Sequence, residues 1–132
     1  MESEKMKKLL LSLALSFFCC EQALAKTYTV TAFCQCKKCC GPNARGITAS
    51  GHKIRHGDRF VAADRSIPFN TMIVVPGYNH GRPVPVLDRG SKIKGNRLDV
   101  YFDNHSAAKK WGVKKLNIRI EKWKLLKVQI KI

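Results

Sequence analysis

Residues 84–102 read VPVLDRGSKIKGNRLDVYF and contain two short apolar segments joined by a turn. Each segment carries one aspartate, Asp88 at the end of the first and Asp99 within the second. Because side chains of a strand alternate between its faces, Asp88 is in phase with the core-facing valines before it. Asp99 and Tyr101 alternate with apolar side chains, which places both on the opposite face, along the wall of a groove. The stretch therefore predicts two strands, at 84–87 and 97–102.

The same pattern of short β-branched or aromatic runs between glycine-rich turns continues on both sides of this stretch. One helix is expected at 104–111, with Asn104 or Ser106 as its N-cap and Gly112 as its stop. Many short strands at close spacing predict an all-β fold, either a small closed barrel or a sandwich. The predicted strands are Thr27–Phe33, Phe60–Ala63, Thr71–Val75, Val84–Leu87, Arg97–Phe102, Leu116–Ile120 and Trp123–Ile132.

Residues 1–25 have the pattern of a secretory signal peptide. Two lysines precede the apolar run Leu9–Cys20, and Ala23-Leu24-Ala25 follows it. The run is shorter than the about 20 residues that a membrane-spanning helix needs. We therefore expect cleavage after Ala25 and one exported domain, residues 26–132, that is secreted or periplasmic and associated with the cell wall. An uncleaved N-terminal anchor is the alternative.

The chain is strongly basic, with a formal net charge of +16 at pH 7. The first 25 residues contain three lysines and three glutamates, so the whole excess falls in the expected domain. Such a field favours anionic partners, which outside the cell are wall polymers and lipid headgroups, and export argues against nucleic acid. Few carboxylates remain for chemistry after cleavage. They are Asp58, Asp64, Asp88, Asp99, Asp103 and Glu121.

Three of these aspartates, Asp64, Asp88 and Asp99, each end or interrupt an apolar strand pattern. Partly buried carboxylates that lie close together resist ionising together, and one then stays protonated near neutral pH. A general acid that protonates a glycosidic oxygen must itself be a protonated carboxyl group. The alternative is that strand-end aspartates cap turns, as in Asp88-Arg89-Gly90.

Several motifs in series resemble those of the three-aspartate (3D) domain family. In chain order they are Tyr28-Thr29-Val30-Thr31-Ala32, Thr48-Ala49-Ser50-Gly51, Val61-Ala62-Ala63-Asp64, Ile67-Pro68-Phe69-Asn70-Thr71, Val86-Leu87-Asp88-Arg89-Gly90, residues 93–102, Ala108-x-x-Trp111-Gly112 and Ile118-Arg119-Ile120. The resemblance implies a small six-stranded double-psi β-barrel with one short helix, similar to the catalytic barrel of the membrane-bound lytic transglycosylase A family. Asn70 and Ser91 depart from the family's pattern, which more often has glycine at both positions.

The resemblance also implies a reaction and the residues that perform it. By position, Asp99 matches the catalytic acid/base, while Asp88 and Asp64 match supporting aspartates. The implied activity is that of an exported peptidoglycan lytic transglycosylase, which cleaves the MurNAc–GlcNAc bond of the glycan strands without water and forms 1,6-anhydroMurNAc. We expect the protein to be a monomer, and the implied reaction needs no cofactor. A hydroxyl in the family motif, that of Thr48, is expected to contact the substrate.

Basic and aromatic side chains around the aspartates are further candidates for substrate contacts. Lys94 and Arg97, with Lys92, lie between two of the aspartates and could hold lactyl or peptide carboxylates, or could form a solvated basic loop. Tyr101 and Trp111 could stack on a sugar ring or belong to the core.

The remaining cysteines gather in one short segment, CQCKKCC, which contains Cys34, Cys36, Cys39 and Cys40. Export favours disulfides, pairing Cys34 with Cys39 and Cys36 with Cys40, or Cys34 with Cys40 and Cys36 with Cys39. Four close thiolates also suit a tetrahedral zinc ion. In either case we expect a structural role. The four histidines are scattered without the spacing of a metal-binding helix, so the sequence assigns them none.

Two other classes of function compete with the enzyme. A non-catalytic peptidoglycan-binding or expansin-like wall-loosening barrel would keep the fold and basic surface without needing Asp99 as an acid. A cationic effector acting on membranes or nucleic acid would bind with steep salt dependence and would be indifferent to any single aspartate.

Overall fold

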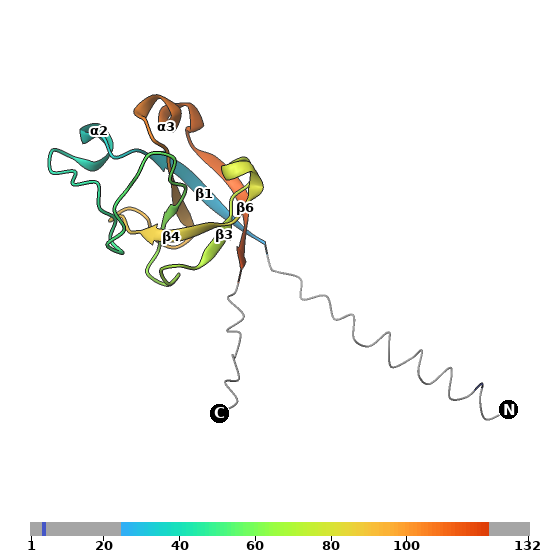
Figure 1. Ribbon diagram of the computed structural model, residues 1–132. Coiled ribbons are helices and arrows are strands. Elements are labelled where there is room, and N and C mark those ends of the chain that lie inside the picture. The colour runs from blue at the N-terminus through green and yellow to red at the C-terminus, as the bar shows by residue number, and fades with distance from the viewer. Residues whose placement is uncertain (1–3, 5–24, 122–132) are drawn as a thin grey trace, which may run out of the picture.

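The computed structural model describes residue 4 and residues 25–121, and its strands close into one barrel (Figure 1). The strand order around the barrel is β1-β5-β2-β4-β3-β6. The strands are β1 (Lys26–Phe33), β2 (Val61–Ala63), β3 (Met72–Val74), β4 (Val84–Asp88), β5 (Arg97–Tyr101) and β6 (Lys114–Glu121). The helical elements are α2 (Lys37–Cys40), the 3₁₀ turn η1 (Asn79–Gly81) and α3 (His105–Trp111). The sandwich is thereby excluded.

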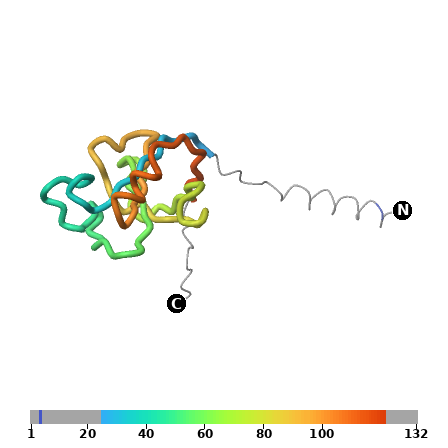
Figure 2. The backbone as a smooth tube through the Cα atoms, turned by 90° about the horizontal axis from the view of Figure 1, so that it is seen from above, coloured from blue at the N-terminus to red at the C-terminus, as the bar shows by residue number. Residues whose placement is uncertain are grey.

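Two neighbouring pairs of strands are parallel, β1 with β5 and β2 with β4, and the other four pairs are antiparallel. Parallel neighbours cannot be joined by a tight hairpin, and other strands lie between β1 and β5 and between β2 and β4 in the chain. The longest single connection, residues 34–60, joins β1 to β2. That connection lies at one side of the barrel in both views (Figure 1, Figure 2). The closed mixed barrel with its short helix confirms the double-psi fold expected from the sequence.

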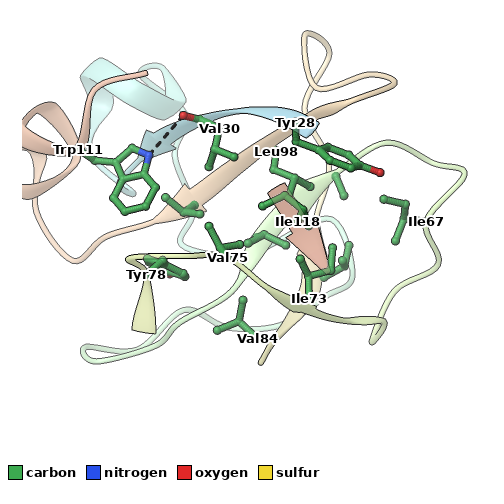
Figure 3. Packing of buried hydrophobic residues seen from close by; sticks show 14 residues of the cluster. Tyr28, Val30, Ile67, Ile73, Val75, Tyr78, Val84, Leu98, Trp111 and Ile118 are labelled. Carbon is green, nitrogen blue, oxygen red and sulfur yellow. Dashed lines mark hydrogen bonds between the residues drawn. The ribbon is translucent and has the colours of Figure 1, made fainter. Parts of the chain in front are cut away.

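Alternation along β5 separates two apolar clusters. Leu98 and Val100 point into the barrel, where they join the main core that is drawn in Figure 3. Tyr101 points outward and stacks on Phe60, with 4.7 Å between the ring centroids. A second cluster therefore covers part of the outer face, beneath the β1–β2 connection. Its buried members are Phe33, Phe60, Ala62, Ile93 and Tyr101.

The helix predicted at the end of the barrel is present as α3. The side chain of Asn104 caps it by accepting a hydrogen bond from the Ala107 backbone N–H at 2.8 Å, and Gly112 follows its last residue. Of the two expected N-caps, Asn104 is thus confirmed, because Ser106 lies inside the helix. No helix among the described residues is both long and apolar enough to cross a membrane.

The described strands begin and end within two residues of the predicted boundaries. β6 begins at Lys114, two residues before the expected strand. The single turn α2 was not predicted, because four residues carry too little periodicity to indicate a helix. The strand predicted at 123–132 and nearly all of the expected signal peptide lie outside the described residues.

We expect the hydrogen bonds of the Tyr78 hydroxyl to contribute substantially to the stability of the barrel. It is buried, donates a 2.6 Å hydrogen bond to the Tyr101 carbonyl and lies 3.3 Å from the Phe60 carbonyl. Tyr78→Phe leaves a buried carbonyl without this partner and should lower the free energy of unfolding by about 1–3 kcal/mol. Urea unfolding measures the loss. The matched control is Tyr28→Phe, which removes a hydroxyl from the other side of the same cluster (Figure 3); an equal loss in both variants would contradict the prediction.

Candidate active site

A cleft of about 580 Å³ opens on the outer face of the barrel, between β4, β2, β5 and the β1–β2 connection. Its floor carries Asp88 from β4, Ala62 from β2 and Asp99 from β5. The rest of its lining comes from two loops and the second apolar cluster: Phe33, Gln35, Cys39, Cys40, residues 43–47, Ile54, residues 89–90 and Ile93. Two of the three predicted catalytic aspartates thus meet in one cleft.

The register of β2 explains why these two aspartates face the same space. Ala62 is paired with Asp88 on one side and with Asp99 on the other. Directly paired residues point to the same face of a sheet, and strands lie about 4.8 Å apart, so the two aspartate backbones are separated by about 10 Å. The small methyl group of Ala62 between them leaves this space open.

A bulge in β4 turns Asp88 toward the cleft. Val61 pairs with Val86, but the next residue, Ala62, pairs with Asp88, so Leu87 is an extra residue in β4. Val86 is in the main core, whereas Leu87 packs against the outer cluster. A bulge of this kind re-aims the side chain that follows it. The expectation that Asp88 faces the core is therefore wrong, because simple alternation does not hold across the bulge.

Asp99 is a half-buried carboxyl with one close donor. The Thr31 hydroxyl donates to its Oδ1 at 3.0 Å from the neighbouring strand β1. Burial raises the pKa of Asp99 to about 6, and the charge of Asp88 adds to this rise, although Thr31 and Arg97 act against it. The protonated and ionised forms of Asp99 are therefore both accessible near neutral pH, as an acid/base group requires.

Asp88 is held in place by backbone donors from two sides. Its Oδ1 accepts hydrogen bonds from the N–H groups of Ala49 and Arg89, both at 2.9 Å. The Arg89 guanidinium in turn donates to the Ala63 carbonyl at 3.2 Å and to the Ile67 carbonyl at 2.7 Å. Asp88 thus presents a fixed carboxylate at the other end of the cleft floor.

Asp64, the third predicted aspartate, lies outside this cleft. It borders a neighbouring pocket of about 460 Å³ together with Lys94. Its two oxygens accept from the Ser66 N–H at 2.8 Å and from the Gly95 N–H at 3.1 Å. These hydrogen bonds, Ser66 first, and the charge of Lys94 lower the pKa of Asp64 to about 2. Asp64 therefore caps a turn and also anchors the loop that leads into β5.

The predicted basic contacts lie beside the aspartates. Lys94 is exposed at the pocket of Asp64 rather than in the main cleft. Arg97 is exposed at the start of β5, close enough for its charge to lower the pKa of Asp99. A cation missed by the sequence analysis, Arg45, lines the cleft itself. In a chain with 25 lysines and arginines, nothing in the sequence distinguishes this one.

Two predicted substrate contacts are corrected by burial. Tyr101 is fully buried, so its ring belongs to the outer cluster and is not available to a sugar. Thr48 is also buried, and its hydroxyl lies 2.9 Å from that of Ser50 and accepts from the His52 N–H. Thr48 therefore shapes the turn that presents the Ala49 N–H to Asp88. Trp111 belongs to the core, where its Nε1 donates to the Val30 carbonyl (Figure 3).

Three of the four clustered cysteines lie around one histidine, and the fourth points away from it. Cys34, Cys36 and Cys39 gather around His105, a residue that the sequence analysis left without a role. All four described cysteines have free thiols. Cys40 is directed elsewhere, and its Sγ donates to the Cys34 carbonyl at 3.1 Å. Cys39 and Cys40 also line the cleft, so this cluster is continuous with its wall.

Comparison with known proteins identifies a family and several cell-wall relatives. Residues 59–122, which hold all three aspartates but not the cysteines, match the model of the 3D domain. The chain is 31% identical over 102 residues to the cell wall-binding protein YocH of Bacillus subtilis, covering 75% of this chain and 34% of YocH. It is 38% identical over 68 residues to a protein of Aquifex aeolicus named "Probable endolytic peptidoglycan transglycosylase RlpA", covering 50% and 28%.

Among solved structures, MltA from E. coli matches with a TM-score of 0.44 and 25% identity, over 58% of this chain and 27% of MltA. The chain spans only about a third of the length of the curated relatives YocH and RlpA. The family-model match nevertheless agrees with the resemblance seen in the sequence. Residues 59–122 of the chain match the 3D domain family.

Proposed function

We propose that this chain is an exported peptidoglycan lytic transglycosylase in which Asp99 is the acid/base. The observation that carries the proposal is a half-buried carboxyl with a pKa raised to about 6, facing a fixed second carboxylate across an open cleft floor. A role at the cell wall is supported by the relatives, since YocH is named for wall binding and RlpA for peptidoglycan transglycosylase activity. Export directed by residues 1–25, with cleavage after Ala25, would place residues 26–132 at the wall.

The proposed reaction uses one carboxyl group twice, first as an acid and then as a base. Protonated Asp99 donates to the glycosidic oxygen that joins MurNAc C1 to GlcNAc C4, and the C1–O bond breaks as the GlcNAc leaves with a free 4-hydroxyl. The positive charge that develops at C1 is stabilised by the Asp88 carboxylate at the other end of the floor. The MurNAc 6-hydroxyl then attacks C1, and ionised Asp99 accepts its proton. The products are a 1,6-anhydroMurNAc end and a new GlcNAc end, and no water is consumed.

The other residues of the site bind and position. Arg45 in the cleft and Arg97 beside Asp99 are suited to the lactyl and peptide carboxylates of the glycan strand. Asp64 is a positioning residue, because its hydrogen bond to Gly95 holds the loop that leads into the strand of Asp99. The excess positive charge of the chain attracts the anionic wall as a whole.

A non-catalytic wall-binding domain is the second candidate, and the match to YocH favours it. Such a domain would use the same cleft and the same arginines. It would not depend on the protonation of Asp99, and this difference separates the two candidates.

We expect Asp99→Asn to abolish cleavage and leave binding intact. The amide cannot donate and recover a proton in the reaction, so turnover should fall by roughly 10²–10⁴-fold. Mass spectrometry of digested peptidoglycan measures 1,6-anhydroMurNAc ends, and sedimentation with insoluble peptidoglycan measures binding. Glu121→Gln, which removes a half-exposed carboxylate that pairs with Arg119 on β6, is the control for charge. Products with reducing-end muramic acid would indicate a hydrolase. If the wild type bound peptidoglycan but formed no product, the enzyme proposal would be wrong and the non-catalytic binding domain would be supported.

The pH dependence of cleavage should report the pKa of Asp99. The active form is protonated, so kcat/KM should fall about tenfold per pH unit above about pH 6. Thr31→Val removes the hydrogen bond that lowers this pKa and should move the falling limb to higher pH. Release of dye-labelled fragments from peptidoglycan follows both profiles. A limb at the same pH in both proteins would show that another group titrates.

Asp64 should contribute stability that is lost in acid. Its pKa in the folded protein is lowered to about 2, so its contribution is complete above about pH 4 and disappears as the pH falls toward 2. In Asp64→Asn this part of the pH dependence should be missing, whereas Glu121→Gln should retain it. Urea unfolding at several pH values measures the slopes. A wild-type slope in Asp64→Asn would contradict the proposed anchoring role.

A further inference from the structure

We propose that Cys34, Cys36, Cys39 and His105 form a structural zinc site. The four donor atoms, three Sγ and one imidazole nitrogen, all lie within 4.8 Å of one another. Three cysteines and one histidine are a frequent ligand set of closed, tetrahedral zinc sites. The site does not depend on the proposed function, because a wall-binding domain would contain it equally.

The distances between donor atoms suit a tetrahedron around zinc. With Zn–S bonds of about 2.3 Å and Zn–N bonds of about 2.0–2.1 Å, two sulfurs lie about 3.8 Å apart and a sulfur and a nitrogen about 3.6 Å. His105 Nδ1 lies 3.5 Å from the sulfur of Cys39, 3.6 Å from that of Cys36 and 4.0 Å from that of Cys34. The sulfurs of Cys34 and Cys39 are 3.6 Å apart.

One distance is shorter than the others. The sulfurs of Cys34 and Cys36 are 2.9 Å apart, which lies between a disulfide bond of about 2.05 Å and the edge of the tetrahedron. A disulfide between these two cysteines would explain that contact but not the approach of His105 to all three sulfurs. A metal ion explains the convergence of the whole set, and the histidine is therefore the decisive ligand.

Two separate parts of the chain build the site. Cys34 follows β1 directly and is buried. Cys36 is the N-cap residue of α2 and Cys39 lies within it, and the Cys39 N–H donates a hydrogen bond to the Cys36 carbonyl. His105 opens α3, whose first turn is capped by Asn104. The two parts are joined just before the ligands by a 2.8 Å hydrogen bond from the Phe102 N–H to the Phe33 carbonyl. In Figure 1, α2 and α3 lie at the same end of the barrel.

The charge and position of the site give it a structural role. Three thiolates and a neutral histidine leave Zn²⁺ with a net charge of −1, and Lys37 and Lys38 between the ligands offset this charge. A ligand, Cys39, lines the cleft with Asp99. Zinc would therefore join the cleft wall to α3, across a connection that has only short secondary structure of its own.

The experiment compares metal content in the full chain and in matched variants. The chain is purified under reducing conditions, loaded with zinc, dialysed and analysed by inductively coupled plasma mass spectrometry. We expect one zinc per chain, and after exchange with Co²⁺ an absorption spectrum with thiolate-to-cobalt charge transfer. Cys39→Ser should lose the metal. Cys40→Ser, the matched cysteine control, and His80→Asn, a histidine control in the exposed turn η1, should retain it.

A further variant tests the histidine with the remaining cysteine removed. In the Cys40→Ser background, His105→Ala should weaken zinc binding at least tenfold, and His105→Cys should restore it with a changed cobalt spectrum. Chelation should lower the Tm of the wild type and of Cys40→Ser but not that of Cys39→Ser. Unchanged zinc binding without His105, equal loss in Cys40→Ser and Cys39→Ser, or disulfides that form in the presence of zinc and exclude it would each overturn the proposal.

Discussion

The site depends on the position of one short strand, β2, between β4 and β5. Pairing with both neighbours at Ala62 places Asp88 and Asp99 in one row across the sheet. The bulge at Leu87 is part of the same constraint, because without it Asp88 would share the core-facing side with Val86. The backbone groups that the bulge exposes are bound by the neighbouring turn, where the Ser50 N–H donates to the Leu87 carbonyl and the Ala49 N–H to Asp88. Strand register thus determines the geometry of the site.

The protein then separates its carboxylates by environment. Burial on β5, between β1 and β2, raises the pKa of Asp99, whereas backbone donors and Lys94 lower that of Asp64. The three aspartates resemble one another in sequence because each ends or interrupts an apolar strand pattern. They differ in the structure because one is desolvated, one is fixed by two N–H groups beside the cleft, and one caps a turn outside it. A single chemical group type therefore takes three different roles in one small barrel.

The outer apolar cluster has a similar organising effect. Phe60 and Tyr101 fill the outer face of β2 and β5 and support the β1–β2 connection, which forms one wall of the cleft. The cysteine–histidine cluster lies at the beginning of that connection and joins it to α3. The wall of the cleft is thus supported from below by aromatic packing and, in our proposal, tied at its edge by zinc.

The sequence by itself determined the described strands, the capped helix at 104–111, the separation of Leu98 and Val100 from Asp99, and the resemblance to the 3D domain. These features follow from alternation, turn residues and local capping, all of which act between residues close in the chain. Only the tertiary structure decided that Asp88 faces the cleft, that Asp64 lies outside it, that Tyr101 and Thr48 are buried, and that His105 meets three cysteines. Each of these depends on a bulge, on a register between distant strands or on a contact about 70 residues apart in the chain. The alternation of apolar and polar residues does not predict such contacts, because they form only when the closed barrel brings segments that are distant in the chain together.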